Sequence, residues 1–295
     1  MSGKLRSHLI LVFTALIAGF QYSIAKNVMP DPINPSAVIL IRGVAAATVF
    51  TLIHFLLVKE KIENRKDFVR LMLCALTGVT LNQLLFYEGL NLTTPINASL
   101  MMTSSPILVL IFSSILIKEK ITYYKIIGIV LGATGAILLL INKETTESFF
   151  LGDILVMLNA ASYSVFLVLV KPIMDKYHPL TIVKWMFVLG LIMVLPFSAT
   201  SAFYIDWPSV NSTVWWSLVF IIVFPTIIAY YLNVAVLQYV NPSIAGIYIY
   251  LQPVLATIIA VVLGKDYFSW ERGFYSLLIF SGVYLVSSKN LGKRN

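Results

Sequence analysis

The chain has 295 residues, of which 59% are hydrophobic and 12% are charged, and its mean hydropathy is +0.90. Since a water-soluble domain carries about 25% charged residues, this chain has too few charges to cover a surface that faces water. The composition therefore excludes a soluble globular protein and predicts a chain that crosses a membrane many times.

Apolar segments long enough to cross a bilayer follow one another along the chain. A crossing takes about 20 mainly apolar residues. No small-residue cleavage site follows the first segment, which favours a retained span over a signal peptide. We predict ten spans, at residues 8–26, 35–58, 68–89, 95–117, 123–141, 152–172, 179–199, 213–236, 243–263 and 271–288.

The second half of the chain repeats the first. One constant shift places Pro95 on Pro242 and Gly135 on Gly282. Each copy holds five predicted spans, and this odd number means that the second copy enters the membrane from the opposite side. The sequence thus predicts an all-α membrane protein with ten transmembrane helices, arranged as two inverted-topology repeats (residues 8–142 and 152–288) around a central cavity. This plan recurs among secondary transporters.

Basic residues fix the expected orientation. With the N-terminus in the cytoplasm, the inner connections hold most of the lysines and arginines, including Lys59, Arg65 and Lys118, and the outer connections hold few. The positive-inside rule favours this arrangement, with both termini in the cytoplasm and the chain in the inner (plasma) membrane. We therefore attribute the net charge of +8 to membrane orientation and expect no nucleic-acid partner.

Glycines in the span at 123–141 are spaced for close helix packing. Gly128, Gly132 and Gly135 share one face, and small residues at this spacing let helix backbones approach closely in lipid. Ordinary glycine frequency in membrane helices is the alternative reading. The spans at 123–141 and 271–288 fit a peripheral or dimer-facing place, so a monomer and a homodimer both stay open.

Motifs for other functions do not occur in the sequence. It lacks the nucleotide-binding G-x-x-x-x-G-K-[ST], the zinc motif H-E-x-x-H, the nucleophile motif G-x-S-x-G and the channel filter T-V-G-Y-G. The histidines His8, His54 and His178 lie near predicted span ends, and the single cysteine, Cys74, permits no intramolecular disulfide. We expect no metal, no cofactor and no enzymatic activity.

Three ionisable residues lie toward the outer side of the first repeat. Arg42 is inside a predicted span, whereas Lys26 and Glu88 end spans. Ionisable groups within a bilayer are costly and usually functional. We expect them to form an electrostatic group that closes the outer vestibule or meets a charged group of the substrate. For Lys26 and Glu88 the alternative is that their side chains extend to the membrane interface.

Polar side chains near span centres are the candidates for the substrate site, because amides in hydrocarbon need a partner or a watered cavity. Hydrogen bonding between helices is the alternative for each. Pro106 and Pro253 interrupt helical hydrogen bonding at matching points, which either frees a carbonyl group or makes a packed kink. The candidates are Gln21, Tyr22, Asn82, Gln83, Ser99 and Thr103 in the first repeat, and Asn159, Tyr163, Tyr230, Asn233, Tyr248 and Gln252 in the second.

Short motifs occur in a fixed order along the chain. They are Gly19-Phe20, Arg42, Phe86-Tyr87-Glu88-Gly89-Leu90, Ser105-Pro106, Ile117-Lys118-Glu119-Lys120-Ile121-Thr122, Tyr163, Gln252-Pro253 and Gly264-Lys265-Asp266. In this order each half resembles the EamA-type domain of the drug/metabolite transporter superfamily. Lys118 stands where that family usually has glycine, and Asp266 stands where it usually has glutamate.

The resemblance implies a secondary transporter that moves a small organic metabolite, such as an amino acid or a related solute, by alternating access. It favours export, and it implies a cavity lined by the first, third and fourth spans of each repeat. The expected partners are a small-molecule substrate and the lipid bilayer. A non-transporting sensor or assembly protein and an intramembrane enzyme are the alternatives from other classes. The enzyme would need paired catalytic groups within the spans, and the sequence shows no such pair.

Overall fold

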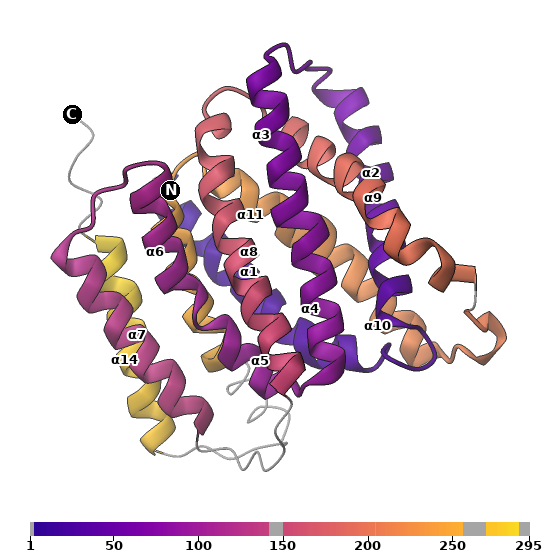
Figure 1. Cartoon of the computed structure of the whole chain (residues 1–295). Helices are drawn as coiled ribbons and strands as arrows, with labels where there is room; N and C mark the ends of the chain where they lie inside the picture. The colour runs from indigo at the N-terminus through magenta and orange to yellow at the C-terminus, as the bar shows by residue number, and fades with distance from the viewer. Residues whose placement is uncertain (1–2, 142–149, 204, 256–269, 289–295) are drawn as a thin grey trace.

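The computed structural model of the chain consists of helices that run roughly side by side (Figure 1). It describes residues 3–141, 150–203, 205–255 and 270–288, and these ranges contain no β-strand. The helices of the first half are α1 (Gly3–Lys26), α2 (Pro35–Leu57), α3 (Arg65–Ala75), η1 (Leu76–Thr80), α4 (Leu81–Leu92), α5 (Pro95–Met102), α6 (Ser105–Leu116) and α7 (Tyr123–Ile141). Those of the second half are α8 (Phe150–Met174), α9 (Pro179–Phe203), η2 (Trp207–Ser209), α10 (Ser212–Ile221), η3 (Ile222–Ala229), α11 (Tyr230–Val236), α12 (Pro242–Ile247), η4 (Tyr248–Tyr250) and α14 (Trp270–Ser288).

Six helical segments are long and apolar enough to cross a membrane, which agrees with the expected all-helical membrane fold. Shorter apolar helices lie within three further predicted spans, at Ser105–Leu116, Tyr123–Leu138 and Gly273–Val286. The predicted span at 243–263 extends outside the described residues, and so does the segment between the two predicted repeats, 8–142 and 152–288. The six long segments are Leu5–Lys26, Pro35–Leu57, Arg65–Leu92, Phe150–Met174, Pro179–Ser201 and Ser212–Val236.

Asparagine and proline mark several helix starts. The Asn34 side chain accepts a hydrogen bond from the Ser36 amide at 2.9 Å, and Pro35 opens α2. The Asn211 side chain caps α10 in the same way, through the Val214 amide at 3.0 Å. An asparagine oxygen satisfies an amide that the first turn leaves free, and proline lacks the amide that would be unpaired there.

Two of the long segments contain a π-helical stretch. η1 joins α3 to α4, and η3 joins α10 to α11. The shift that aligns Pro95 with Pro242 also aligns these two stretches, so they occupy corresponding places in the two halves. Pro225 lies inside η3, where its missing amide removes one helical hydrogen bond.

The predicted span at 95–117 is broken into two helices. α5 ends at Met102 and α6 begins at Ser105, with Pro106 in its first turn. A proline there loses no hydrogen bond, because the first amides of a helix have no partner within it. Pro253 lies in the short helical stretch 251–255 that follows η4.

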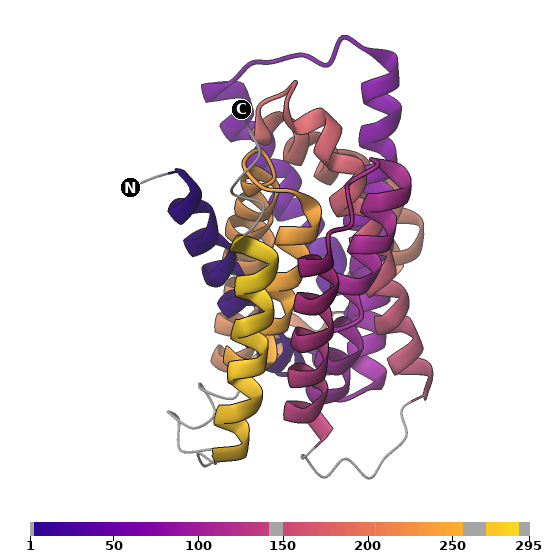
Figure 2. The ribbon, with the colours of Figure 1, turned by 90° about the vertical axis from the view of Figure 1, so that its left-hand side faces the viewer.

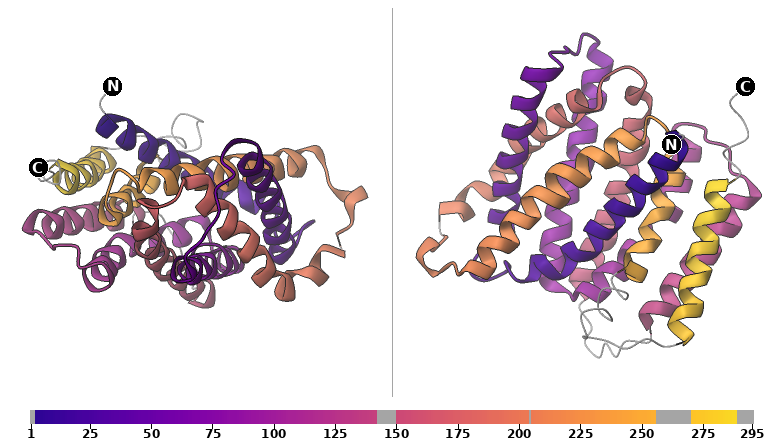
Figure 3. Two further views of the ribbon diagram at one scale, coloured as in Figure 1. Left: turned by 90° about the horizontal axis from the view of Figure 1, so that it is seen from above. Right: turned by 180° about the vertical axis from the view of Figure 1, so that it is seen from behind.

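The helices pack in an order that sets up the interior. α7 packs against α14 at one end of the molecule and α2 packs against α9 at the other (Figure 3). Between them, α8 contacts α4, α5 and α6, while α1 runs along α10, η3 and α11. The start of α1, the end of α14 and the connection between α2 and α3 lie at the same end of the bundle (Figure 2).

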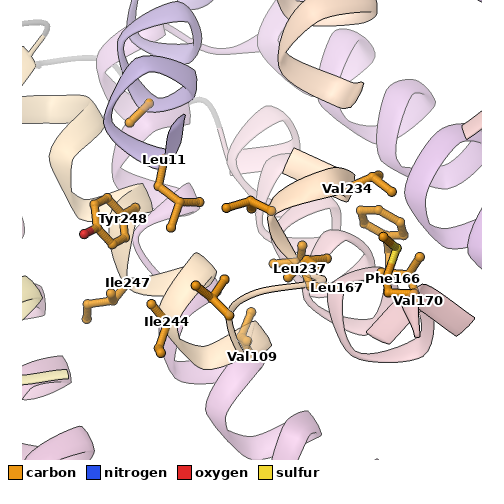
Figure 4. Close-up of a cluster of buried hydrophobic side chains, with 14 of the residues drawn as sticks. Leu11, Val109, Phe166, Leu167, Val170, Val234, Leu237, Ile244, Ile247 and Tyr248 are labelled. Carbon is orange, nitrogen blue, oxygen red and sulfur yellow. The ribbon is translucent and has the colours of Figure 1, made fainter. Parts of the chain in front are cut away.

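Two clusters of buried apolar side chains hold the bundle together. One includes Leu11, Val109, Phe166 and Val234 (Figure 4), and the other includes residues such as Ile33. α1 contributes to both clusters, with Leu11 and Ala15 in the first and Tyr22 and Ala25 in the second. The helix therefore links the two clusters along its length.

Glycines bring α7 and α14 into backbone contact. A Cβ atom added at Gly128 would lie 2.7 Å from the Gly282 carbonyl oxygen, and one added at Gly135 would lie 2.7 Å from the Tyr275 carbonyl oxygen. Backbone atoms cannot move aside as side chains do. The close approach of the two helices therefore depends on these glycines.

We expect Gly128→Ala to destabilise the protein by about 1–3 kcal/mol, because the added methyl group overpacks the contact with α14. The measurement is the melting temperature in detergent. Thr134→Ala is the matched control, since Thr134 is an exposed position on the same helix. A melting temperature for Gly128→Ala equal to that of the control would mean that the helix pair tolerates a wider spacing.

Candidate functional site

A cavity of about 130 Å³ lies where the two halves of the chain meet. Its lining comes from α1, α2, α4, α5 and α8, and from η3, α11, α12, η4 and residue 252. Pockets for drug-sized ligands measure roughly 300–1,000 Å³. The volume therefore suits a small solute.

The cavity gathers most of the polar residues predicted for the substrate site. Ser99, in α5, and Thr103, in the turn between α5 and α6, do not line it. Side chains from the first, third, fourth, sixth, eighth and ninth predicted spans contribute, and Arg42 adds one from the second. The predicted residues that line the cavity are Gln21, Tyr22, Asn82, Gln83, Asn159, Tyr163, Tyr230, Asn233, Tyr248 and Gln252.

One face of α1 forms a wall of the cavity. Residues three or four apart share a helix face. The lining residues of α1 follow this spacing and are mainly small or polar. The small side chains leave space for a solute, and the polar ones can form hydrogen bonds with it. They are Leu11, Thr14, Ala15, Ile17, Ala18, Gln21 and Tyr22.

Hydrogen bonds join α1 to the second half of the chain across the cavity. The Thr14 hydroxyl donates to Asn233 Oδ1 at 3.0 Å, and the Tyr22 hydroxyl donates to Gln252 Oε1 at 3.1 Å. Nearer the start of the helix, His8 Nδ1 and the Tyr248 hydroxyl are 2.6 Å apart. Side chains of the site thus also hold the two halves together.

Arg42 reaches into the cavity from α2. Its Nε donates to the Thr226 hydroxyl at 2.7 Å, and its Nη1 donates to Gln83 Oε1 at 3.3 Å. The guanidinium carbon lies 4.6 Å from the centre of the Tyr87 ring, a cation–π contact. The Tyr87 hydroxyl in turn accepts from Gln21 Nε2 at 3.1 Å. Arg42 is thereby held in place by residues of both halves.

Lys26 and Glu88 have other partners and do not line the cavity. Lys26 Nζ donates to the Asn91 carbonyl oxygen at 3.0 Å, and Glu88 Oε1 accepts from the Ser36 hydroxyl at 2.8 Å. In the part of the chain that the structure describes, no salt bridge joins these two residues to each other or to Arg42. The expected electrostatic group is therefore spread over separate contacts, and Arg42 alone of the three faces the cavity.

Three polar atoms of the lining lack a hydrogen-bond partner among the described residues. They are Gln83 Nε2, Asn159 Oδ1 and the Tyr230 hydroxyl, and all are buried. The other end of the Asn159 amide donates to the Asn82 carbonyl oxygen at 2.6 Å. Since buried polar atoms nearly always have partners, these three are the natural contacts for a solute or for water.

Aromatic rings supply the apolar part of the lining. The Tyr22 and Phe86 ring centres are 5.5 Å apart, and those of Phe86 and Tyr87 are 5.2 Å apart. Tyr163 and Tyr230 lie in the same lining and each packs against Phe166. A solute in the cavity would meet flat apolar surfaces as well as amides.

The two prolines predicted to break helices do not line the cavity. Pro106 is buried at the start of α6, and Pro253 is buried next to Gln252. Among the described residues, no three His, Cys, Asp or Glu side chains come together as a metal site.

Sequence reasoning missed Thr14, Tyr87 and Thr226. The three- and four-residue spacing from Thr14 through Ala18 to Gln21 was the available signal for Thr14. Tyr87 stands in the motif Phe86-Tyr87-Glu88-Gly89-Leu90, which indicates the family resemblance but does not indicate that Tyr87 faces the cavity. No sequence pattern singled out Thr226, whose role follows from its contact with Arg42.

Comparison with known proteins finds similar sequences over nearly the whole chain. The profile described as the EamA-like transporter family matches residues 5–141 and again residues 150–288. An uncharacterized transporter of Archaeoglobus fulgidus is 24% identical to this chain over 288 residues, which is 96% of this chain and 98% of that protein. The uncharacterized transporter YyaM of Bacillus subtilis is 23% identical over 88% of this chain and 87% of its own.

A solved crystal structure shares the fold. It superposes with a TM-score of 0.73 over 98% of this chain and 99% of that chain, at 20% sequence identity. At this identity the likeness supports the fold alone.

We expect Thr226→Val to destabilise the protein by about 1–3 kcal/mol, because it leaves the Arg42 Nε–H buried without an acceptor. Thr226→Ser, which keeps the hydroxyl, is the matched control and should melt close to the wild type. The measurement is the melting temperature of both variants in detergent. Equal melting temperatures for the valine and serine variants would show that the hydrogen bond contributes nothing to holding Arg42.

Proposed function

Because the chain belongs to the EamA-like transporter family, we propose that it is a secondary transporter that moves a small organic metabolite across the membrane by alternating access. The family and the names of its relatives indicate a transporter rather than an enzyme. The observation that carries the proposal is the polar cavity between the two halves, where secondary transporters bind their substrates.

The substrate site consists of the lining residues whose polar atoms face the cavity. Gln83, Asn159 and Tyr230 contact the solute with the atoms that have no partner among the described residues. Asn233 and Gln252 contact it while also bonding to α1. Since α1 is held to the second half by side chains of the site, a solute that competes for these bonds changes how firmly the halves are joined.

The ten spans form two inverted repeats, residues 8–142 and 152–288. Helix pairs that correspond under the repeat support this arrangement, because α2 packs against α9 and α7 packs against α14. The contact of α4 with α8 has its counterpart in the contact of α11 with α1. A twofold pseudo-symmetry axis in the membrane plane produces this pattern of contacts.

The chain lies in the inner (plasma) membrane with both termini in the cytoplasm, and it exports its substrate. The connection between α2 and α3 holds Lys59 and Lys61, and Lys66 follows in the first turn of α3. These basic residues support this orientation, since the start of α1 and the end of α14 lie at the same end of the bundle as that connection. Export rests on the family resemblance.

The test of function compares metabolites released by cells with and without the chain, followed by uptake of the released compound into proteoliposomes. We expect at least one small organic compound to accumulate in the medium only when the chain is present, and its uptake to saturate with concentration. An unchanged medium would contradict the transporter proposal. Non-saturating flux accompanied by current would indicate a channel.

For the compound identified in this way, we expect Tyr230→Phe to weaken the apparent affinity by about threefold to tenfold. The stability should not fall, because the lost hydroxyl has no partner within the described residues. Tyr250→Phe is the matched control, since the Tyr250 hydroxyl is also buried without such a partner but lies outside the cavity lining. Equal affinities for the two variants would remove Tyr230 from the substrate site.

A cysteine-labelling experiment tests the orientation. In a Cys74→Ala background, Asn211→Cys should react with an impermeant thiol reagent added from outside, and Arg65→Cys should not. Both positions are exposed, at the starts of α10 and α3, so accessibility within the protein does not distinguish them. The reverse pattern of labelling would overturn the orientation.

A further inference from the structure

Arg42 is the charged residue of the cavity lining. The residue is only 3% exposed, and the rest of the lining within the described residues is apolar, aromatic or neutral and polar. A guanidinium stays ionised at any physiological pH. The cavity therefore carries a permanent positive charge.

The partners of this charge are all neutral. Two of its five N–H groups donate to Thr226 and Gln83, and the ring of Tyr87 covers one face. No carboxylate forms a salt bridge with it among the described residues. An isolated charge in a low-dielectric interior is costly unless a counter-charge or a polar environment stabilises it.

A second buried cation in the same chain is handled differently. Lys125 is 2% exposed, and its Nζ lies 2.6 Å from Glu119 Oε1 and 3.2 Å from the Lys120 carbonyl oxygen. Within the described part of the chain, the fold thus supplies a carboxylate to a buried cation outside the cavity and supplies none to Arg42. The difference points to a counter-charge that comes with the solute.

We propose that Arg42 binds the carboxylate of the transported solute, and that the solute class is a small organic monocarboxylate with an apolar body. This inference rests on the proposed transport function and names its substrate class. The planar fork of a guanidinium matches a carboxylate in two parallel hydrogen bonds. Gln83 Nε2, which has no partner among the described residues, adds a donor beside it.

The charge balance favours a monoanion over a zwitterion. One carboxylate neutralises Arg42, and the ammonium group of an amino acid would then restore a net positive charge in the cavity. No aspartate or glutamate lines the cavity within the described residues to receive that ammonium. The rings of Tyr22, Phe86 and Tyr163 suit an apolar or flat body instead.

The experiment uses matched probes that differ in one group. One set is 3-phenylpropionate, its neutral amide 3-phenylpropionamide and L-phenylalanine, which adds the ammonium. The second set is 4-methylpentanoate, its amide and L-leucine. The readout is the rise in melting temperature of the purified full chain in detergent as each probe is titrated at constant ionic strength.

We expect at least one of the two carboxylates to stabilise the wild type, with its amide and its amino acid much weaker. Arg42→Gln should weaken the apparent affinity for that carboxylate by about tenfold or more. Arg65→Gln is the matched control, because it removes an exposed guanidinium at the start of α3, and it should bind as the wild type does.

A second variant, Arg42→Lys, tests the proposal if Arg42→Gln does not fold. Arg42→Lys keeps the charge and loses the planar fork, so the carboxylate should still bind with lower apparent affinity. An affinity unchanged in Arg42→Lys would place the carboxylate elsewhere and overturn the proposal.

Other outcomes also contradict it. If neither carboxylate stabilises the protein, or if the acid and its amide stabilise it equally, Arg42 does not bind a carboxylate in this cavity. If the amino acids bind as well as the simple acids, the solute is not restricted to monoanions. The comparison of released metabolites separates this inference from the transport function. Saturable transport of a neutral or cationic compound would end the anion proposal and leave the transporter in place.

Discussion

A polar group within a bilayer has to find its partner inside the protein, and this constraint shapes the whole molecule. The backbone meets it by forming helices, which make up most of the described residues. The side chains meet it across the interior, where Thr14 bonds to Asn233 and Tyr22 bonds to Gln252. Because those bonds join α1 to the second half, the same side chains that define the cavity also determine how the halves associate.

Much of the fold and of the candidate site followed from this constraint at the level of sequence. Apolar length predicted the long spans, and the rule that mid-span amides need a partner or a cavity selected Asn82, Gln83, Asn159 and other lining residues. The same rule does not say which side of a helix faces inward. The rule therefore also selects Ser99, which lies outside the cavity lining.

Features that depend on contacts between distant segments could not be predicted from the sequence. Thr226 matters because Arg42, far away in the chain, reaches it. The break between α5 and α6 could not be predicted from Pro106 alone, because a proline can either kink a helix or start one. The separate partners of Lys26 and Glu88 likewise follow from the packing of α1, α2 and α4, which no local pattern encodes.

The two π-helical stretches have a consequence for the rotational phase of the helices that contain them. Relative to an α-helix, a π-helical turn accommodates an extra residue, and one residue corresponds to about 100° of rotation. Asn82 and Gln83 come just after η1, and Tyr230 and Asn233 come just after η3. Uninterrupted α-helices through the same sequence would turn these four side chains to other faces. The π-helical stretch just before α4 and the one just before α11 therefore determine which side chains of these helices face the cavity.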